Sequence, residues 1–428
     1  MRQPAPPGLV RLYARLAGLV APLAYRRISV RLQAQDIDPK RFPERMGRAT
    51  ATRPDGKLLW FHAASVGESL SVLRLIEYMG EEQPALSFLI TSGTATSAQL
   101  LARRLPPRCQ HQFAPLDSRS AVRRFLAHWR PDAAVFVESE LWPNMLRETH
   151  RTGVPLALLN ARISDRSARQ WKRFGRTARY LLGLFAMIHT QDERTTRHFH
   201  DLGLTHAVTG QNLKSASGPL PYDAEQLQSL RQTLAERPNW VASSTHPGEE
   251  EIILDAHEAL LATHPDLLLI VVPRHPERGD EVQQLIEARN MTQARRSTGG
   301  APGPGVQVYL ADTMGETGLW YAMSPIVCLG GSFTPVGGHN PYEPAYAGAA
   351  VLHGPLYANF AGAYAEFSSA GGTVEIADAA ALTDEIGRLL TQPDQLRALC
   401  TQSSRFAAAQ EDMLGTLSDT LSRALGLR

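Results

Sequence analysis

VCLGGSFTPVGGHNPYE, residues 327–343, is the stretch that decides the fold. The apolar run at 326–329 is short enough to predict a buried strand, and Gly330 and Gly331 end it. A loop with two further glycines, Gly337 and Gly338, follows. A strand that runs into a glycine-rich turn lets the backbone approach a ligand closely.

The end of this stretch predicts the start of a helix. Asn340 is a good N-cap, Pro341 suits the first helical position, and Glu343 stands three residues after the cap. The free N–H groups and the dipole of such a helix favour an anion, so we expect a phosphate ligand here. The alternative is a well-capped helix after a tight loop.

The composition is that of a soluble globular protein with two domains. The chain has 428 residues, of which 43% are hydrophobic and 20% charged. Its three cysteines are far apart and offer neither a disulfide framework nor a CxxC zinc site, which favours a reducing, cytoplasmic location. They are Cys109, Cys328 and Cys400.

The net charge of +2 conceals a strong asymmetry between the two halves. Residues 1–215 hold 32 Lys and Arg against 17 Asp and Glu, which gives +15, and residues 216–428 hold 12 against 25, which gives −13. A basic first half predicts an anionic partner, either nucleic acid or a phospholipid surface.

Residues 9–24 are apolar apart from Arg11 and Arg15. Two arginines make a membrane span costly, and a secretory signal would have an uninterrupted apolar core. We expect an interfacial amphipathic helix that associates with a membrane, supported by Arg26, Arg27 and Arg31. The alternative is a helix packed on the protein's own surface.

Alternating strand and helix patterns predict parallel sheets built from βαβ units. The expected strands lie in two series, at 58–63, 87–90, 133–137, 156–159 and 186–189, and then near Val241 and at 267–272, 306–310, 326–329 and 350–352. The fold class is therefore α/β, with two Rossmann-like doubly wound domains. Ligands of such domains usually bind at the carboxyl ends of the strands, in the cleft between the domains.

The predicted boundaries follow from composition. Residues 1–30 form the membrane-associating helix, 31–210 the N-terminal domain, 211–238 a linker, and 239–428 the C-terminal domain with its closing helices. The linker is placed by a segment rich in Ser, Gly and Pro at 215–222.

Carboxylates follow two strands of the first half. Glu68 has the spacing of a capping box with Ser65, which is its structural interpretation, and its place at a strand end also suits a base that takes a proton from an acceptor hydroxyl. Glu138 and Glu140 project to the same side of the chain, but no third oxygen ligand is suggested nearby. We therefore keep Glu138 as a carboxylate of the cleft and predict no metal.

The second half offers polar residues at its strand ends. Arg274, after Pro273, suits a phosphate or a base, and an ion pair with a nearby acid is its alternative. None of the histidines at strand ends has the spacing of a zinc site. They are His62, His246, His275 and His339.

Basic residues recur at helical spacing over 162–179. Such a face suits anionic headgroups, or it is simply solvated. Because aromatic residues are not interleaved with it, a stacking platform for nucleic acid is not favoured, and we expect no nucleic-acid partner.

Six motifs in order along the chain resemble those of the 3-deoxy-D-manno-octulosonic acid (Kdo) transferases, the lipid A glycosyltransferases. They are WFHAASVGE (60–68), VFVESELWPN (135–144), TGQNLK (209–214), PRHPER (273–278), DTMGE (312–316) and GGSFTPVGGHNPYEPA (330–345). The resemblance covers most of the chain. TGQNLK has one residue more than the TGNLK typical of the family.

The resemblance implies a GT-B architecture, with the acceptor on the N-terminal domain and the nucleotide sugar on the C-terminal one. It implies CMP-Kdo as donor, a lipid A precursor (lipid IVA) as acceptor, inversion at the anomeric carbon, no cofactor and no metal. It also implies a location at the cytoplasmic face of the inner membrane.

The resemblance assigns roles residue by residue. Glu68 matches the general base, and Glu138 and Lys214 match residues that stabilise the transition state. The CMP-binding segments match three groups of residues. These are Pro273 and Arg274; Met314, Gly315 and Glu316; and Asn340, Pro341, Tyr342 and Glu343.

Other functions stay open at this point. One is a GT-B enzyme that uses another nucleotide sugar, such as a UDP-sugar transferase or a sugar-nucleotide epimerase. Another is a non-catalytic protein that binds a nucleotide at the membrane. Nucleic-acid binding by the basic half is the third.

Overall fold

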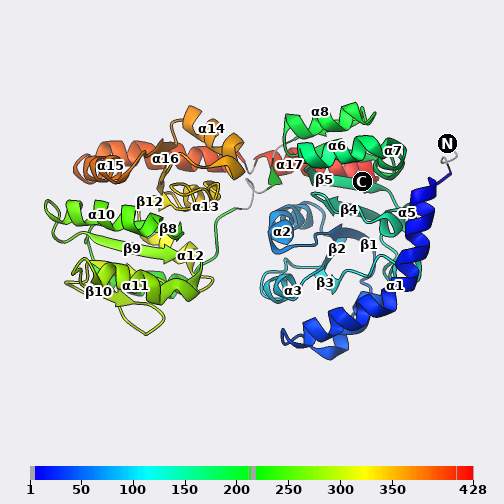
Figure 1. Cartoon of the computed structure of the whole chain (residues 1–428), viewed down its shortest axis with the longest axis horizontal. Coiled ribbons are helices and arrows are strands. Elements are labelled where there is room, and N and C mark those ends of the chain that lie inside the picture. Colours follow the sequence, from blue (N-terminus) through cyan, green and yellow to red (C-terminus); the bar gives the residue numbers. More distant parts are fainter. Residues whose placement is uncertain (1–4, 211, 214–217, 411, 428) are drawn as a thin grey trace. The chain divides into compact units, whose positions relative to one another are not determined.

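The computed structural model describes residues 5–210, 212, 213, 218–410 and 412–427, which form two compact units (Figure 1). The first unit comprises residues up to 217 together with 413–428, and the second comprises 218–412. Each unit is a parallel seven-stranded sheet with helices on both faces. The doubly wound α/β fold predicted from the alternating pattern is confirmed for both.

The first unit begins with α1 (Gly8–Gln33) and a 3₁₀ helix, η1 (Pro39–Met46). Its strands, in the spatial order β3-β2-β1-β4-β5-β6-β7, are β1 (Lys57–His62), β2 (Leu86–Ser92), β3 (Cys109–Phe113), β4 (Ala133–Val137), β5 (Leu156–Ala161), β6 (Met187–Thr190) and β7 (Ala207–Thr209). Its further helices are α2 (Val66–Glu82), α3 (Ala95–Ala102), α4 (Arg119–Trp129), α5 (Pro143–Arg151), α6 (Asp165–Arg173), α7 (Gly175–Leu182), α8 (Glu193–Asp201) and α17 (Asp412–Leu425).

The second unit repeats this plan. Its strands, in the order β10-β11-β9-β8-β12-β13-β14, are β8 (Asn239–Thr245), β9 (Leu268–Pro273), β10 (Gln293–Arg295), β11 (Val308–Leu310), β12 (Ile326–Leu329), β13 (Ala350–His353) and β14 (Thr373–Glu375). Its helices are α9 (Ala224–Leu234), α10 (Glu249–Leu261), η3 (Pro276–Arg278), α11 (Gly279–Glu287), α12 (Thr317–Met323), α13 (Tyr342–Tyr346), η4 (Ala358–Phe360), α14 (Ala361–Ser369), α15 (Ala379–Thr391) and α16 (Pro393–Ala409).

The central strands could be predicted from the sequence because they are buried and therefore apolar. In β1, β2, β4 and β5 nearly every residue is buried, as expected for a parallel sheet covered on both faces. The four strands that the sequence did not predict, β3, β7, β10 and β14, are the outermost strands of the two sheets. Edge strands pair on one side only, and three of these four are three residues long, so they carry little apolar signal.

The domain boundaries differ from the prediction at two places. The predicted linker, 211–238, contains α9, which buries Leu227 and Leu234 in the core of the second unit. The predicted C-terminal domain ends too late, because residues from 413 onward belong to the first unit. Composition does not reveal which of two similar sheets an amphipathic terminal helix covers.

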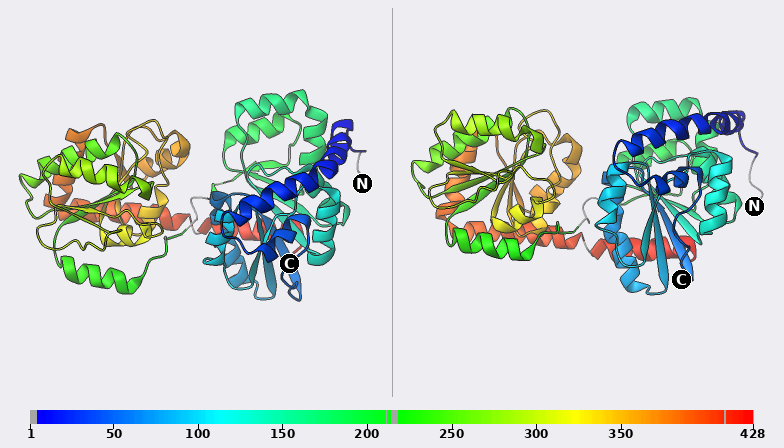
Figure 2. Two further views of the ribbon diagram at one scale, coloured as in Figure 1. Left: turned by 60° about the horizontal axis from the view of Figure 1, so that its bottom comes forward. Right: turned by 90° about the horizontal axis from the view of Figure 1, so that it is seen from below.

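Helix α17 is held on the first unit by apolar packing and two hydrogen bonds. Leu414, Leu417 and Leu421 join the core beside α2 and β2. Lys57 Nζ donates to the Leu427 carbonyl at 2.8 Å, and Gln83 Nε2 donates to Ser422 Oγ at 3.0 Å. Figure 2 shows α17, in red, against the first unit.

Helix α1 runs along the outside of the first unit (Figure 2). One side of it is buried through Val10, Ala14, Ala21 and Leu32, and it contacts α4, α5 and η1. Its other side is exposed and apolar, with Leu19 78% exposed. Among the helices that the structure describes, none combines the length and the apolar character that crossing a bilayer requires.

We predict that Leu421→Ala destabilises the first unit selectively. The side chain is fully buried, so its truncation should lower the free energy of unfolding by about 3 kcal/mol. Hydrogen exchange followed by mass spectrometry should show faster exchange in β1 and β2 and unchanged exchange in β8 and β9. Arg423→Ala, on the exposed side of the same helix, is the control. Faster exchange in the second unit instead would contradict the assignment of α17.

Candidate functional site

Glu68 lies at the start of α2 and takes part in a capping box, as its spacing from Ser65 predicts. Ser65 Oγ accepts from the Glu68 N–H at 3.3 Å and donates to Glu68 Oε1 at 2.7 Å, while the Ala64 N–H donates to Oε2 at 2.9 Å. These bonds fix the carboxyl group of Glu68, a residue that is only 8% exposed. The structural interpretation of Glu68 is therefore correct, and it leaves the chemical one open.

The surroundings of Glu68 favour its protonated form. Burial raises the pKa of this carboxyl, and the negative charges of Glu140 and Glu138 raise it further, against the hydrogen bonds from Ser65 and Ala64, which lower it. A carboxyl whose pKa is moved toward neutrality is suited to accept and release protons. The three carboxylates therefore form one electrostatic group at the carboxyl ends of β1 and β4.

Glu138 stands directly after β4 in a left-handed conformation, with φ of 55°. Its N–H donates to the Leu159 carbonyl at 2.9 Å, which continues the ladder between β4 and β5 by one residue. A left-handed conformation is uncommon for a side chain other than Gly and persists where the surroundings impose it. The chain thus turns sharply at Glu138, where the sequence places a carboxylate of the site.

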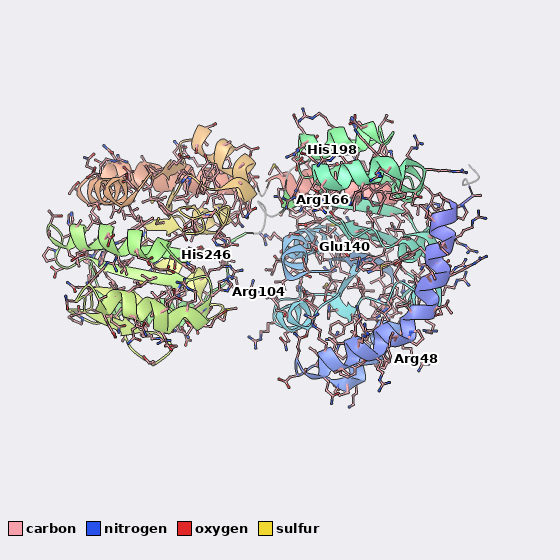
Figure 3. All side chains as sticks on the ribbon, in the orientation of Figure 1. Arg48, Arg104, Glu140, Arg166, His198 and His246 are labelled. Carbon is pink, nitrogen blue, oxygen red and sulfur yellow. The ribbon has the colours of Figure 1, made fainter. Side chains whose placement is uncertain are left out.

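Glu140 is paired with a buried histidine. His62 Nε2 lies 3.6 Å from Glu140 Oε2, and Trp142 Nε1 donates to the same oxygen. Burial works against ionisation of Glu140, but these two partners outweigh it and lower its pKa. Glu140, labelled in Figure 3, is therefore an ionised neighbour of Glu68.

His62 is itself fixed from the other side. Its Nδ1 lies 2.9 Å from Thr91 Oγ1, which also accepts a hydrogen bond from Trp60 Nε1 at 2.8 Å. The sequence indicated His62 as a strand-end residue but not its partner. Glu140 was weighed only as half of a metal pair, and within the described residues no cluster of His, Cys, Asp or Glu suited to a metal ion is found.

Lys214 lies outside the described residues, so its predicted role stays a prediction. The segment just before it is held to the first unit, because the Leu213 N–H donates to Asn160 Oδ1 at 3.1 Å. Asn160 is buried near the end of β5 and has a φ of 53°.

In the second unit, the glycine-rich loop after β12 is wrapped around one buried carboxylate. Oε1 of Glu249 accepts hydrogen bonds from the N–H groups of Ser332 and Phe333, at 2.9 and 2.8 Å. Its Oε2 accepts from Gly331 and His246, at 2.6 and 3.0 Å. The N–H groups at the start of the loop are therefore occupied by Glu249, whereas the phosphate was predicted at the helix start around Asn340.

Close approach explains the glycines of this loop. A Cβ on Gly330 would lie 2.6 Å from the Ser244 carbonyl oxygen, and one on Gly331, whose φ is 67°, would lie 2.8 Å from the His339 ring. The loop closes where the Gly338 N–H donates to the Gly331 carbonyl at 2.6 Å. It forms a rigid turn in which His339 is brought back beside the start of the loop.

The predicted helix start after this loop is observed one residue later and is short. Helix α13 begins at Tyr342, and Pro341 occupies the N-cap position without a side-chain bond. Asn340 Oδ1 still accepts from the Tyr342 N–H at 3.2 Å, and its Nδ2 donates to Glu343 Oε1 at 3.3 Å. The Tyr342 ring is buried and stacks on Phe406, so most of this side chain serves packing.

Arg274 is exposed at the carboxyl end of β9, directly after Pro273. Its N–H donates to the Thr245 carbonyl at 3.1 Å, which places it beside the end of β8. The alternative interpretation, an ion pair with a neighbouring acid, finds no support, because no such pair with Arg274 is present in the described part of the chain. The guanidinium thus stays available to an anionic ligand.

Met314, Gly315 and Glu316 form a tight turn before α12. Met314 is 77% exposed, and Gly315 has a φ of 85°. The Glu316 carboxylate is held by Arg296, with distances of 2.6 and 3.1 Å to Nη2 and Nε, and by the Thr313 hydroxyl. The pair with Arg296 leads the causes that lower the pKa of Glu316. Glu316 therefore already holds the turn in shape, which the sequence did not reveal.

The sequence matches one family over its first half and relatives over most of its length. Residues 40–217 match the family described as 3-Deoxy-D-manno-octulosonic-acid transferase (kdotransferase). The probable mitochondrial 3-deoxy-D-manno-octulosonic acid transferase of Arabidopsis thaliana is 35% identical over 90% of this chain and 89% of its own. The 3-deoxy-D-manno-octulosonic acid transferase of Bordetella pertussis is 33% identical over 90% of this chain and 92% of its own.

The chain belongs to the 3-deoxy-D-manno-octulosonic acid transferase family. It is a glycosyltransferase, as the resemblance implied. Among solved structures, the UDP-GlcNAc 2-epimerase of Neisseria meningitidis bound to UDP-GlcNAc superposes with a TM-score of 0.58 at 12% identity, over 87% of this chain and 100% of that one. At that identity the likeness concerns the fold alone. The predicted GT-B architecture of this Kdo transferase is confirmed.

We predict that Glu249→Gln loosens the glycine-rich loop of the Kdo transferase. A glutamine offers one acceptor oxygen and places an NH₂ group against N–H donors, so the free energy of unfolding should fall by about 3 kcal/mol. Urea denaturation measures the loss, and hydrogen exchange at residues 331–333 should quicken. Glu258→Gln, on the exposed side of α10, should change neither. Unchanged exchange in the loop would show that Glu249 does not hold it.

Proposed function

We propose that the enzyme transfers Kdo from CMP-Kdo to a lipid A precursor (lipid IVA), in the biosynthesis of the lipopolysaccharide core. The observation that carries this proposal is the fixed, buried carboxyl of Glu68 in the first turn of α2, shortly after β1, with its pKa raised, in a chain that belongs to the Kdo transferase family. Family membership supports the sugar, and the carboxyl supports the chemistry.

In this proposal Glu68 is the general base. It takes the proton of an acceptor hydroxyl as that oxygen attacks the anomeric carbon of Kdo, from the face opposite the phosphate. The configuration is then inverted, and no metal is needed to activate the acceptor. Glu138 and Lys214 stabilise the transition state. The ionised Glu140 makes Glu68 a stronger base, because a neighbouring negative charge disfavours a second one.

The second unit is proposed to bind the CMP part of the donor. Arg274 offers a rigid guanidinium at a strand end, where α/β folds bind phosphorylated ligands. The segment from Asn340 to Glu343 and the turn at Met314 and Gly315 supply further contacts. The hydrogen bonds of Glu249 and Glu316 fix the shapes of the loop and the turn before the ligand arrives, which reduces the ordering cost of binding.

A GT-B enzyme for another donor is the nearest rival, because the fold alone does not fix the nucleotide. Competition between nucleotides decides this point: CMP should inhibit transfer and UDP should not. A non-catalytic nucleotide-binding protein is the second rival. Removing the carboxylate of Glu68 distinguishes the two, because only an enzyme would lose its activity.

We predict that Glu68→Gln lowers transfer by at least 10²-fold and leaves CMP binding unchanged. Glutamine keeps the capping box but cannot accept the proton. Transfer is measured by mass spectrometry of the lipid acceptor, and CMP binding by calorimetry. Glu81→Gln, exposed near the end of the same helix, should keep full activity. Full activity of Glu68→Gln would refute the assigned base, and its loss of CMP binding would point to a structural defect.

We also propose that the enzyme binds the cytoplasmic face of the inner membrane through α1. The exposed side of this helix carries an apolar stripe, made of Leu9, Leu12, Leu16, Leu19, Val20 and Leu23. Arginines flank it at positions 11, 15, 26, 27 and 31, all exposed or partly exposed. An apolar stripe bordered by cations is typical of helices that lie in the interface of anionic lipids.

A basic surface near α1 supports the proposal that this side of the first unit contacts the membrane. Six arginines and a lysine between residues 162 and 179 are exposed, all but Arg162 on helices α6 and α7, and Arg166 is labelled in Figure 3. Helix α5 contacts both α1 and α7, so the two surfaces are separated by one helix. Each cation near an anionic surface contributes roughly 1 kcal/mol.

We predict that the double variant Leu16→Glu and Leu19→Glu binds anionic vesicles at least tenfold more weakly than the parent protein. The substitutions place charge in the centre of the exposed stripe and leave the buried side of α1 intact. Sedimentation with phosphatidylglycerol vesicles measures the binding. Val208→Glu, at an exposed valine of β7, is the control. Equal binding of all three proteins would exclude α1 as the membrane contact.

A further inference from the structure

Three histidines that the proposed mechanism does not use gather in the second unit. His246 follows β8, His275 follows β9, and His339 ends the glycine-rich loop. His246 Nε2 and His339 Nε2 lie 2.9 Å apart, with their rings stacked at 5.2 Å and 9°. The His275 ring meets His246 edge-on at 5.8 Å. His246 is labelled in Figure 3.

A hydrogen bond between two Nε2 atoms requires one proton between them. One imidazole donates and the other accepts, so at most one of the two rings is protonated while this bond is present, and two protonated rings at this distance would repel each other. Burial lowers the pKa of His246, and burial together with the neighbouring His246, Arg274 and His275 lowers the pKa of His339 to about 4. Without a ligand the pair therefore carries no charge at neutral pH.

Two arginines and a third histidine are near the pair. Arg274 and His275 act on both rings, and Arg278 acts on His246. The acid that acts on His246 is Glu249, whose carboxylate already accepts four backbone hydrogen bonds. Arg278 is engaged by Glu250 and Glu281, whereas Arg274 has no ion pair among the described residues. This cluster has the composition of an anion-binding site.

We propose that the His246–His339 pair and Arg274 bind the phosphate of the nucleotide, and that the pair takes up a proton when that phosphate becomes a dianion. This inference rests on the proposed function and adds a role for two residues that have none in it. The Nε2–Nε2 hydrogen bond then breaks, and both rings can donate to phosphate oxygens.

The charges balance through the reaction. In the donor the phosphate is a diester with one negative charge. When the bond from the anomeric carbon to the phosphate oxygen breaks, the electron pair stays on that oxygen, and CMP leaves with two negative charges. The proton of the acceptor hydroxyl goes to Glu68, and the proton that the imidazole pair takes up comes from solvent. The pair thus favours the leaving group over the donor.

The direction of the pH effect follows from the sign of the ligand charge. A nearby dianion favours the charged form of an imidazole and raises its pKa above that of the empty site. Between the two pKa values, binding takes up a proton, so CMP binding weakens as pH rises from the lower pKa to the higher one and levels off above it. A purely structural His–His contact that fastens the loop predicts no such uptake.

Calorimetric titration with CMP at pH 7.5 tests this inference. At this pH the phosphate of CMP is already a dianion, because its second pKa is about 6, so any uptake belongs to the protein. Titration in three buffers that differ in ionisation enthalpy gives the number of protons. We expect an uptake that approaches one proton per CMP, and none with cytidine, which has no phosphate.

Variants identify the residues that take up the proton. His246→Asn and His339→Asn keep a polar side chain but cannot titrate, so each should abolish the uptake and weaken CMP binding about tenfold. His264→Asn, in the loop after α10, is the matched control and should behave as the parent protein. Circular dichroism verifies that each variant is folded.

The possible failures are distinguishable. If the parent protein binds CMP without proton uptake, or if both histidine variants retain the uptake, this inference is overturned and the proposed function stands. If the parent protein does not bind CMP at all, the proposed donor site and this inference fail together.

Discussion

The buried carboxylate of Glu249 is the constraint on which the second unit depends. Four backbone N–H groups converge on it, three from the glycine-rich loop and one from the turn after β8. A buried carboxylate is costly unless it is fully hydrogen-bonded, and these N–H groups are equally costly without an acceptor. The loop and the carboxylate therefore fix each other, and the fixed loop brings His339 beside His246.

Both units have left-handed residues near the carboxyl ends of central strands. Glu138 directly follows β4 and has a φ of 55°. Asn160 and Ser244 are the penultimate residues of β5 and β8, with φ values of 53° and 58°, and the pairing register shifts at both positions. A left-handed conformation at a residue other than Gly persists where the surrounding structure imposes it, so the parallel sheets hold the backbone in these conformations at the strand ends.

The sequence predicted the elements that bury apolar side chains and missed those that depend on partners distant in the chain. Central strands such as 133–137 can be recognised in the sequence as apolar runs, whereas the edge strands cannot. Glu68 could be found because its capping spacing is local. The partner of His62 could not, because the contact joins the end of β1 to Glu140 in the segment after β4, nearly eighty residues later. Glu249 stands in the sequence as the first of three consecutive acidic residues, and nothing local distinguishes it, because its hydrogen-bond partners lie in a loop about eighty residues later.

The most direct test of the account is transfer from CMP-Kdo, generated in situ, to a tetra-acylated lipid A precursor in the presence of EDTA, read by mass spectrometry. We expect the acceptor to gain the mass of one or more Kdo units, and the reaction to be inhibited by CMP and not by UDP. No gain in mass, from an enzyme that still binds CMP, would contradict the proposed acceptor, and inhibition by UDP in place of CMP would contradict the proposed donor.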